Sequence, residues 1–160
     1  MSNEELNKLN DIRTQIKRIN SKFKLLTLIK KAKDEYAKNN HADCLKTCKE
    51  ILKTDVKNSI ALRGMGCVMQ SQGNYAKALE YYTLALENSE RKEIEYTLIG
   101  TIYYLEDDFD NAIENYNKAI DINDNYDKAY EGRNQAILEN HIKIIDLQDQ
   151  LIKSENTCGW

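Results

Sequence analysis

Apolar residues in the middle of the chain recur at three- and four-residue intervals, the spacing of one face of an α-helix. The first such face comprises Leu62, Met65, Gly66 and Met69. The next comprises Ala78, Tyr82, Ala85 and Leu86. Between them Gly73 and Asn74 break the pattern, because glycine reaches positive φ without steric cost and suits a tight turn. The pattern predicts two helices joined by a short turn, with small residues that allow close approach and tyrosines that fill the remaining space.

The same pattern occurs again 34 residues further along the chain. Five pairs of residues mark the repeat: Gly66 and Gly100, Tyr75 and Phe109, Ala78 and Ala112, Tyr82 and Tyr116, Ala85 and Ala119. A fixed period of this length is typical of stacked repeat units rather than a single wrapped core. Asp107 and Asp108 occupy the places of Gly73 and Asn74, and aspartate supports turns through local side-chain hydrogen bonds. The sequence therefore predicts the helix–turn–helix unit in both copies.

A degenerate copy precedes these two. The places of Gly66, Ala78, Tyr82 and Ala85 are held one period upstream by Ala32, Cys44, Cys48 and Ile51. Asn39 and His41 replace the turn residues Gly73 and Tyr75. The unit at the end of a repeat array is expected to be atypical, so we interpret this stretch as the first repeat.

Both ends of the chain carry an amphipathic stripe of their own. The N-terminal stripe has heptad spacing and comprises Leu9, Ile12, Ile16, Ile19, Phe23 and Leu26. We expect this helix, which Ser2 and Glu5 are spaced to cap, to cover the open end of the stack, the alternative being that it pairs with another chain. The C-terminal stripe follows the start of a fourth copy (Ala129, Tyr130, Ala136) and comprises Ile137, Ile144, Leu147 and Leu151. We expect the C-terminal helix to bury the last face of the stack.

These patterns divide the chain into six segments. They are an N-terminal amphipathic helix at 1–24, repeats at 25–58, 59–92 and 93–126, a C-terminal capping helix at 127–153 and a flexible tail at 154–160. The predicted fold class is all-α.

Composition and charge narrow the range of partners. The formal net charge is −3 and no long block of one sign occurs, whereas phosphate binding needs a concentrated basic face, so we expect no nucleic-acid partner. No stretch approaches the length of apolar sequence that spans a membrane. The polar start does not resemble a secretory signal, and four cysteines in such a chain favour reduced thiols, so we expect a cytoplasmic protein.

Two clusters have the appearance of metal sites. Asp121, Asn123, Asn125 and Asp127 are spaced like the start of a calcium loop. Tyr126 stands where that loop needs glycine, and Gly132 where it needs glutamate, so we interpret the segment as a turn between repeats.

His41, Cys44 and Cys48 share one helix face, but three ligands are too few for a closed zinc site. We interpret the two cysteines as buried small residues. No nucleophile–base pair motif, phosphate-binding glycine loop or metalloprotease helix is present. We therefore predict no catalytic residue, no metal and no cofactor.

The pattern over 59–126, with its weaker copies, resembles the tetratricopeptide repeat family, whose unit is a 34-residue pair of antiparallel helices. The resemblance implies a right-handed superhelical solenoid of antiparallel helix pairs. The proline that usually ends each unit is replaced by Val56, Glu90 and Asp124. Either the second helices run on, or the turns depend on Asn58, Ser89 and Asn123.

The family resemblance also implies a concave groove, lined by the first helix of each pair, that docks a peptide or a helix. Carried over position by position, the lining residues are Ile29, Lys33, Tyr36, Arg63, Cys67, Gln70, Thr97, Thr101, Tyr104, Lys128, Glu131 and Gln135.

One subset of the family grips the C-terminal carboxylate of heat-shock chaperones (Hsp70/Hsp90) with Lys, Asn, Asn, Lys and Arg. The matching places hold Ile29, Lys33, Gly64, Ile94 and Leu98 or, one repeat later, Arg63, Cys67, Leu98, Lys128 and Gly132. Neither set supplies the charge-assisted donors that a terminal carboxylate needs, so we predict no carboxylate clamp.

The resulting prediction is a non-enzymatic adaptor that binds a protein or peptide partner in the groove. One alternative is a secretion or assembly chaperone, because class II type III secretion chaperones resemble this chain in length and repeat number. The other is a structural module that forms homodimers through the terminal helices, built on residues 9–26 and 137–152.

Overall fold

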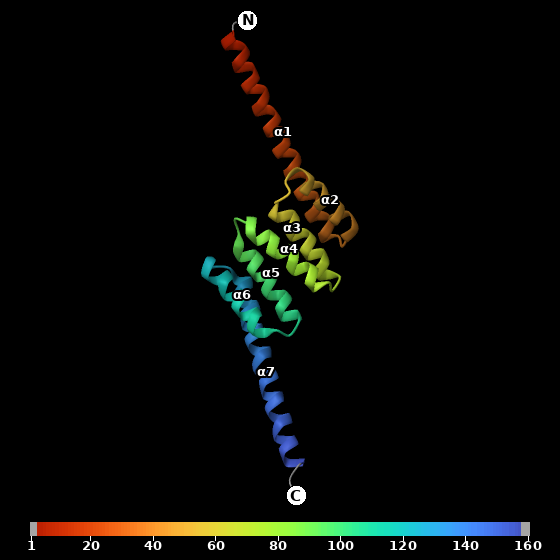
Figure 1. Ribbon diagram of the computed structural model, residues 1–160, viewed down its shortest axis with the longest axis vertical. Helices are drawn as coiled ribbons and strands as arrows, with labels where there is room; N and C mark the ends of the chain where they lie inside the picture. Colours follow the sequence, from red (N-terminus) through yellow and green to blue (C-terminus); the bar gives the residue numbers. More distant parts are fainter. Residues whose placement is uncertain (1–2, 158–160) are drawn as a thin grey trace.

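The computed structural model describes residues 3–157, with side chains up to residue 154. Within that range every regular element is a helix (Figure 1). The helices are α1 (Asn3–Ala37), α2 (His41–Thr54), α3 (Ser59–Ser71), α4 (Tyr75–Asn88), α5 (Lys92–Leu105), α6 (Phe109–Ile122) and α7 (Asp127–Thr157). Each helix packs against the next, α1 also contacts α3, and α5 also contacts α7. The predicted all-α solenoid of antiparallel helix pairs is confirmed.

The turn inside each repeat has the same backbone geometry at a 34-residue interval. Asn39 and Asp107 have a φ of 57°, and Gly73 a φ of 72°, all in the left-handed region. Asparagine and aspartate reach this region more readily than other side chains, which explains why they can stand in for glycine. The residue that follows each of them caps the second helix: the side chains of Asn40, Asn74 and Asp108 accept hydrogen bonds from the backbone N–H three residues on.

The turns between repeats depend on short polar side chains. Asn58 caps α3 by accepting a hydrogen bond from the Ala61 N–H at 3.0 Å. Ser89 and Asn123 each accept one, at 3.1 Å, from the backbone N–H two residues further on. The second helices end at Thr54, Asn88 and Ile122, again one period apart, so they do not continue into the next repeat. The segment with calcium-loop spacing is therefore a turn, as predicted.

Close packing of a tyrosine ring on a glycine joins the two helices of a repeat. A Cβ on Gly66 would lie 2.5 Å from Cε1 of Tyr82, and one on Gly100 would lie 3.0 Å from Cε1 of Tyr116. The Tyr116 ring also faces Gly132 of α7, where a Cβ would lie 2.5 Å from Cζ. Both tyrosines are buried. The small residues are thus required by the approach of the rings, and the rings fill the space between α3 and α4 and among α5, α6 and α7.

The N-terminal helix does not cover the end of the stack, so that expectation was wrong. α1 runs without a break through residue 24 into the first helix of the first repeat, and its outer half extends beyond α2 (Figure 1). The large apolar residues of its stripe are between 36% and 73% exposed. No turn residue separates the two segments, and a continuous helix cannot fold back onto the stack. Ser2, the expected capping residue, lies outside the described residues.

The C-terminal helix covers the stack with only its first half. Ala129 and Ala136 are buried against α5 and α6, whereas Leu138 and the apolar residues that follow it are mostly exposed. α7 continues to Thr157, so the predicted start of a flexible tail at 154 falls inside a helix; residues 158–160 lie outside the described range. Although α1 and α7 are long, none of the described helices combines the length and apolarity needed to cross a membrane.

The ring–glycine contact gives a stability prediction. Gly66→Ala gains about 1 kcal/mol of helix propensity, but it forces a methyl group into the buried Tyr82 ring, and overpacking of this kind costs about 1–3 kcal/mol. We expect a net loss of up to about 2 kcal/mol in the free energy of unfolding, measured by chemical denaturation. In Gly66→Ala/Tyr82→Leu the obstructing ring is gone, so the combined loss should be smaller than the sum of the single losses. If Gly66→Ala were more stable than wild type, the Tyr82 ring would not require glycine at position 66.

Candidate functional site

Two hollows lie side by side on the face formed by the first helices of the repeats. The first has a volume of about 200 Å³ and is lined by residues of α1, α2 and α3. The second, of about 550 Å³, is lined by residues of α3, α5, α6 and α7 together with Tyr126. Arg63 and Cys67 border both hollows, so the two form one continuous depression. We call this depression the groove.

Most of the predicted groove residues lie in it. Those bordering the first hollow are Ile29, Lys33, Tyr36, Arg63 and Cys67. Those bordering only the second are Thr97, Thr101, Tyr104, Lys128, Glu131 and Gln135. Gln70 borders neither, and its Oε1 accepts a hydrogen bond from the Tyr82 hydroxyl at 2.7 Å. The structure therefore brings eleven of the twelve predicted residues together; their role in binding stays a prediction.

Residue-by-residue transfer missed the apolar part of the lining. The omitted residues include Ala32, Ile60, Gly64, Ile94, Leu98, Leu105 and Gly132. Several lie one residue or one helical turn from a predicted position, such as Ile60 beside Arg63 and Leu98 beside Thr97. Because an apolar stripe on a helix is typically about 100° wide, neighbouring positions on the same helices were the available signal.

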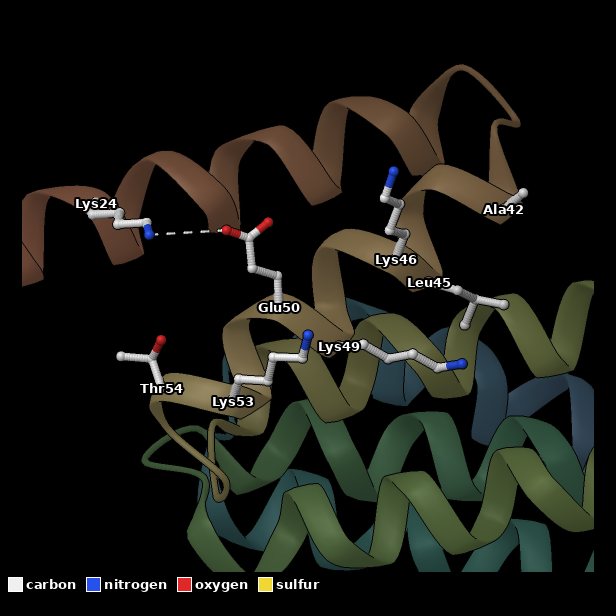
Figure 2. Close-up of a pocket in the computed structure, with 8 residues that line it drawn as sticks. All are labelled: Lys24, Ala42, Leu45, Lys46, Lys49, Glu50, Lys53 and Thr54. Atoms are coloured by element: carbon white, nitrogen blue, oxygen red, sulfur yellow. Dashed lines mark ion pairs between the residues drawn. The ribbon is translucent and has the colours of Figure 1, made fainter.

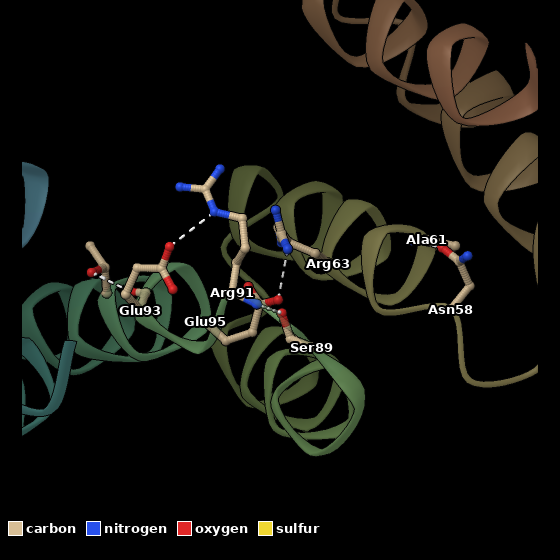
Figure 3. Close-up of polar contacts among 8 residues, drawn as sticks. Asn58, Ala61, Arg63, Ser89, Arg91, Glu93 and Glu95 are labelled. Carbon is tan, nitrogen blue, oxygen red and sulfur yellow. Dashed lines mark hydrogen bonds and ion pairs between the residues drawn. The ribbon is translucent and has the colours of Figure 1, made fainter. Parts of the chain in front are cut away.

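A buried ion pair lies where the two hollows meet (Figure 3). Nη2 of Arg63 donates to Oε1 of Glu95 at 2.8 Å, with the Glu95 side chain 0% and the Arg63 side chain 22% exposed. Nε of Arg63 and Oε2 of Glu95 have no hydrogen-bond partner among the described residues. Because burying two charges costs about as much as their attraction returns, such a pair adds little net stability. Its effect is to hold the guanidinium at the centre of the groove.

The repeat itself contained a signal for this pair. Glu95 occupies the position of Ala61 in the preceding repeat and of Ala129 in α7, and all three residues are buried. A charged residue where two other copies carry alanine must find a partner when it is buried. Periodicity could have marked Glu95, whereas only the fold shows that the partner is Arg63.

One rim of the groove is rich in cations. A further hollow of about 400 Å³ shares Lys33 and Arg63 with the groove and is bordered by four cations and two carboxylates. These are Lys33, Lys57, Arg63, Arg91, Asp55 and Glu90. Arg91 Nε also donates to the buried Glu93 carboxylate at 3.0 Å (Figure 3). Because Arg63 and Arg91 are paired with the carboxylates of Glu95 and Glu93, Lys33 and Lys57 are the cations of this rim that can face an anionic partner segment.

The part of the second hollow around Thr101, Tyr104 and Tyr116 is uncharged and aromatic. The Tyr116 hydroxyl donates to Thr101 Oγ1 at 3.2 Å, and the Thr101 hydroxyl donates to the Thr97 carbonyl oxygen at 2.8 Å. The Tyr104 ring lies on Phe109 with ring centroids 5.7 Å apart. Burial raises the pKa of the Tyr36, Tyr116 and Tyr126 hydroxyls, so these groups stay neutral. The surface is suited to apolar contact and neutral hydrogen bonding rather than to proton transfer.

The cysteines lie beneath the first hollow as free thiols. Cys44 and Cys48 are almost fully buried and Cys67 is partly exposed, whereas Cys158 lies outside the described residues. Burial raises the pKa of the Cys48 thiol to about 12 and also raises those of Cys44 and Cys67. Protonated buried thiols are weak nucleophiles. The interpretation of Cys44 and Cys48 as buried small residues is confirmed, and within residues 3–154 no group of His, Cys, Asp or Glu is placed to hold a metal.

A larger hollow lies elsewhere, on the outer face of α1 and α2 (Figure 2). It has a volume of about 770 Å³, and its polar lining includes Lys24, Lys46, Lys49 and Lys53, with Lys24 Nζ 4.0 Å from a carboxylate oxygen of Glu50. These lysines are exposed on long flexible side chains, and an exposed pair at this distance contributes little. The hollow is a solvated surface between lysine side chains rather than a shaped site.

The raised thiol pKa gives a prediction about alkaline stability. In the unfolded chain Cys48 ionises near its usual pKa of 9.0, whereas in the fold it ionises only near 12. Stability from the protonated thiol is therefore fully present below about pH 9 and is lost as the pH rises toward 12. At about pH 10.5 we expect wild type to have lost about 1–2 kcal/mol more than Cys48→Ala, each relative to its own value at pH 7. Denaturation curves at both pH values measure this, and equal losses would contradict it.

Comparison with known proteins agrees with this geometry. Residues 94–126 match the profile of the Tetratricopeptide repeat family. No curated protein matches the chain in sequence. Among solved structures, the Sgt2 TPR domain from Aspergillus fumigatus has a TM-score of 0.67 at 18% identity, covering 74% of this chain and 80% of that one.

Two further similar structures contain bound peptides. The first TPR of Spaghetti (RPAP3), bound to the HSP90 peptide SRMEEVD, has a TM-score of 0.65 at 13% identity over 72% of this chain and 91% of that one. The Yersinia enterocolitica type III secretion chaperone SycD, in complex with a peptide of the translocator YopD, has a TM-score of 0.64 at 15% identity over 72% and 94%. At these identities the likeness concerns the fold. The repeat period, the helix pairing and these likenesses together show that the chain has the fold of a tetratricopeptide repeat array, and its residues 94–126 match the profile of that family.

Proposed function

We propose that this protein is a non-enzymatic adaptor that binds a peptide or helix of a partner protein in the groove. The observation that carries the proposal is the continuity of the groove: two hollows meet at Arg63 and Cys67 along the inner helices. A depression lined by apolar, aromatic and neutral polar groups, with a few charges, is typical of a binding surface for a polypeptide segment. We propose the cytoplasm as its compartment, because Cys44, Cys48 and Cys67 are free thiols.

We propose that binding does not use a carboxylate clamp. Of the cations that border the groove, Arg63 is already committed to Glu95. Lys33 and Lys128 come from α1 and α7, at opposite ends of the groove, so they do not form one pocket for a terminal carboxylate. The RPAP3 structure holds an HSP90 peptide, but the residues here favour a segment bound through its side chains.

A chaperone for a secreted or assembling partner is a specific form of the same proposal. The SycD structure, which holds a YopD peptide, supports it through likeness of fold. Such a chaperone and an adaptor would bind a segment in the same groove, and they differ in the fate of the partner.

Removing aromatic contacts from the groove tests the proposal. Tyr36→Ala/Tyr104→Ala removes one ring from each hollow. Since aromatic anchors dominate the affinity of such surfaces, we expect partner binding to fall by roughly tenfold or more. Immobilised wild type and variant would be incubated with the same cell extract, and captured proteins compared by quantitative mass spectrometry, followed by titration of the purified partner.

The matched control is Leu84→Ala/Ile122→Ala, which removes two exposed apolar side chains from α4 and α6, outside the groove. This control should bind like wild type. If every partner binds all three proteins equally, the groove is not the binding site.

Homodimerisation through the terminal helices is a second candidate function. The exposed apolar side chains of α1 and α7 favour it. Large apolar residues remain uncovered along the outer halves of both α1 and α7, between 36% and 73% exposed on α1 and between 45% and 60% on α7. Stripes of this size on a soluble surface mark an interaction site. We propose that a second copy covers them, with α1 of one copy packed along α7 of the other.

Charge favours this pairing over α1 with α1. Residues 3–24 contain six cations (Lys8, Arg13, Lys17, Arg18, Lys22, Lys24) and three carboxylates (Glu4, Glu5, Asp11). Residues 138–157 contain four carboxylates (Glu139, Asp146, Asp149, Glu155) and two lysines (Lys143, Lys153). Two α1 helices would repel each other, whereas α1 and α7 attract. Because the two helices project from opposite ends (Figure 1), a two-fold arrangement would satisfy both pairs at once.

Light scattering after size exclusion tests the pairing. Wild type should have the mass of a dimer, and Ile12→Glu/Ile16→Glu on α1 or Leu147→Glu/Leu151→Glu on α7 should each give a monomer, because they disrupt opposite sides of one interface. An equimolar mixture of the two variants should regain dimer, since each supplies the intact helix that the other needs. A wild-type monomer at every concentration would rule the function out, and loss of dimer with the α1 variant alone would indicate α1 self-pairing.

A further inference from the structure

The first repeat lacks the ring that fills the other two. Cys48 lies 34 residues before Tyr82, which lies 34 before Tyr116. The Tyr82 ring lies against Gly66 and its hydroxyl reaches Gln70, and the Tyr116 ring lies between Gly100 and Gly132 with its hydroxyl on Thr101. In both repeats the side chain passes between helices: Tyr116 borders the groove itself, and the Tyr82 hydroxyl ends 3.5 Å from Sγ of the groove residue Cys67. A cysteine is too short to follow this path.

The first hollow lies where that ring is missing. Its floor contains Cys48, Ala32 and Gly64, the last two being the counterparts of the residues that flank the Tyr116 ring. Ile29, Tyr36 and Ile60 form its sides. The volume is about 200 Å³ and the lining is almost wholly apolar. We call these six residues the anchor pocket.

The pocket opens to the groove between two cations. Lys33 and Arg63 both border it and both continue into the neighbouring cation-rich hollow with Lys57 and Arg91. Lys33 is exposed and forms no ion pair with any of the described residues. Since Arg63 is paired with Glu95, a segment that inserts an apolar side chain would lay its adjoining residues over Lys33.

We propose that the anchor pocket binds a phenylalanine-sized side chain of a partner peptide whose neighbouring residues are acidic. This inference rests on the proposed function and specifies the ligand of the same groove. The aromatic side chain takes the place that tyrosine occupies in the other two repeats, where burial of a ring brings a large apolar contact area. The flanking carboxylates meet Lys33 and the neighbouring Lys57, which selects against basic segments.

The probes are short fluorescent peptides with amidated C-termini, so that none offers a terminal carboxylate. One has a central Phe flanked by Asp and Glu, one replaces this Phe by Ala, and one keeps the Phe between Ser residues. Fluorescence anisotropy with wild type should give a Kd roughly tenfold or more lower for the acidic Phe peptide than for the Ala peptide. The Ser-flanked peptide should bind more weakly and with less dependence on salt.

A variant of the protein whose own side chain fills the anchor pocket tests whether the peptide needs that space. Ala32→Gly/Cys48→Tyr restores the glycine and tyrosine of the other repeats, and Gly64 leaves room for the ring as Gly132 does for Tyr116. The variant should fold, as its helical circular dichroism will show, and should bind the Phe peptide no better than the Ala peptide. Cys48→Ala leaves the pocket open and should keep the preference. In Lys33→Glu the acidic Phe peptide should lose affinity while the Ser-flanked peptide does not.

The outcomes separate this inference from the proposed function. Equal affinity of wild type for the Phe and Ala peptides, or no measurable binding of the Phe peptide, overturns the anchor pocket. Unchanged binding in the folded Ala32→Gly/Cys48→Tyr variant overturns it as well. If binding is instead lost in Tyr104→Ala, the groove function stands without the pocket. If cellular partners ignore every groove variant while the peptide preference holds, the pocket stands and the groove is not the site of those partners.

Discussion

The packing of a tyrosine ring against glycine sets the spacing of the helices in the second and third repeats and of α7. Tyr82 lies on Gly66, and Tyr116 lies on both Gly100 and Gly132, so one ring fixes the approach of two or three helices. If one helix shifted by one residue relative to the other, the tyrosine ring would no longer lie against glycine. This requirement keeps the two helices of a unit in one register, and the turns at Asn39, Gly73 and Asp107 follow at the same period.

The functional features arise where single residues depart from that repeat. Cys48 replaces a tyrosine and leaves an apolar hollow, and Glu95 replaces an alanine and brings a buried carboxylate to Arg63. Both departures adjoin α3, on either side of Arg63, which borders every hollow near the groove. A repeat protein can specialise in this way because each unit contacts mainly its neighbours, so a local substitution changes one surface without disturbing the rest.

The terminal helices show how the same local pattern can have different outcomes. Residues 9–26 and 137–152 carry stripes that suit burial, as the stripes of α3 and α4 do. A turn folds α4 back onto α3, whereas nothing interrupts α1 before Ala37 or α7 after Asp127. Their outer halves therefore extend past the last neighbour, and apolar residues such as Phe23 and Leu147 remain exposed. Amphipathic spacing indicates that a face needs a partner, but not whether the partner is in the same chain.

The sequence by itself determined the helix pairs, the turns and half of the groove lining, because each depends on positions that recur every 34 residues. Gly66 with Tyr82, or Gly73 with Asn74, can be recognised by comparison with the next copy. The tertiary structure alone decided which charge pairs with Glu95, that the missing ring at Cys48 opens onto the groove, and that α1 leaves its stripe exposed. These features depend on the distance between residues of different units and on how far one helix extends past another, and helical periodicity contains neither quantity.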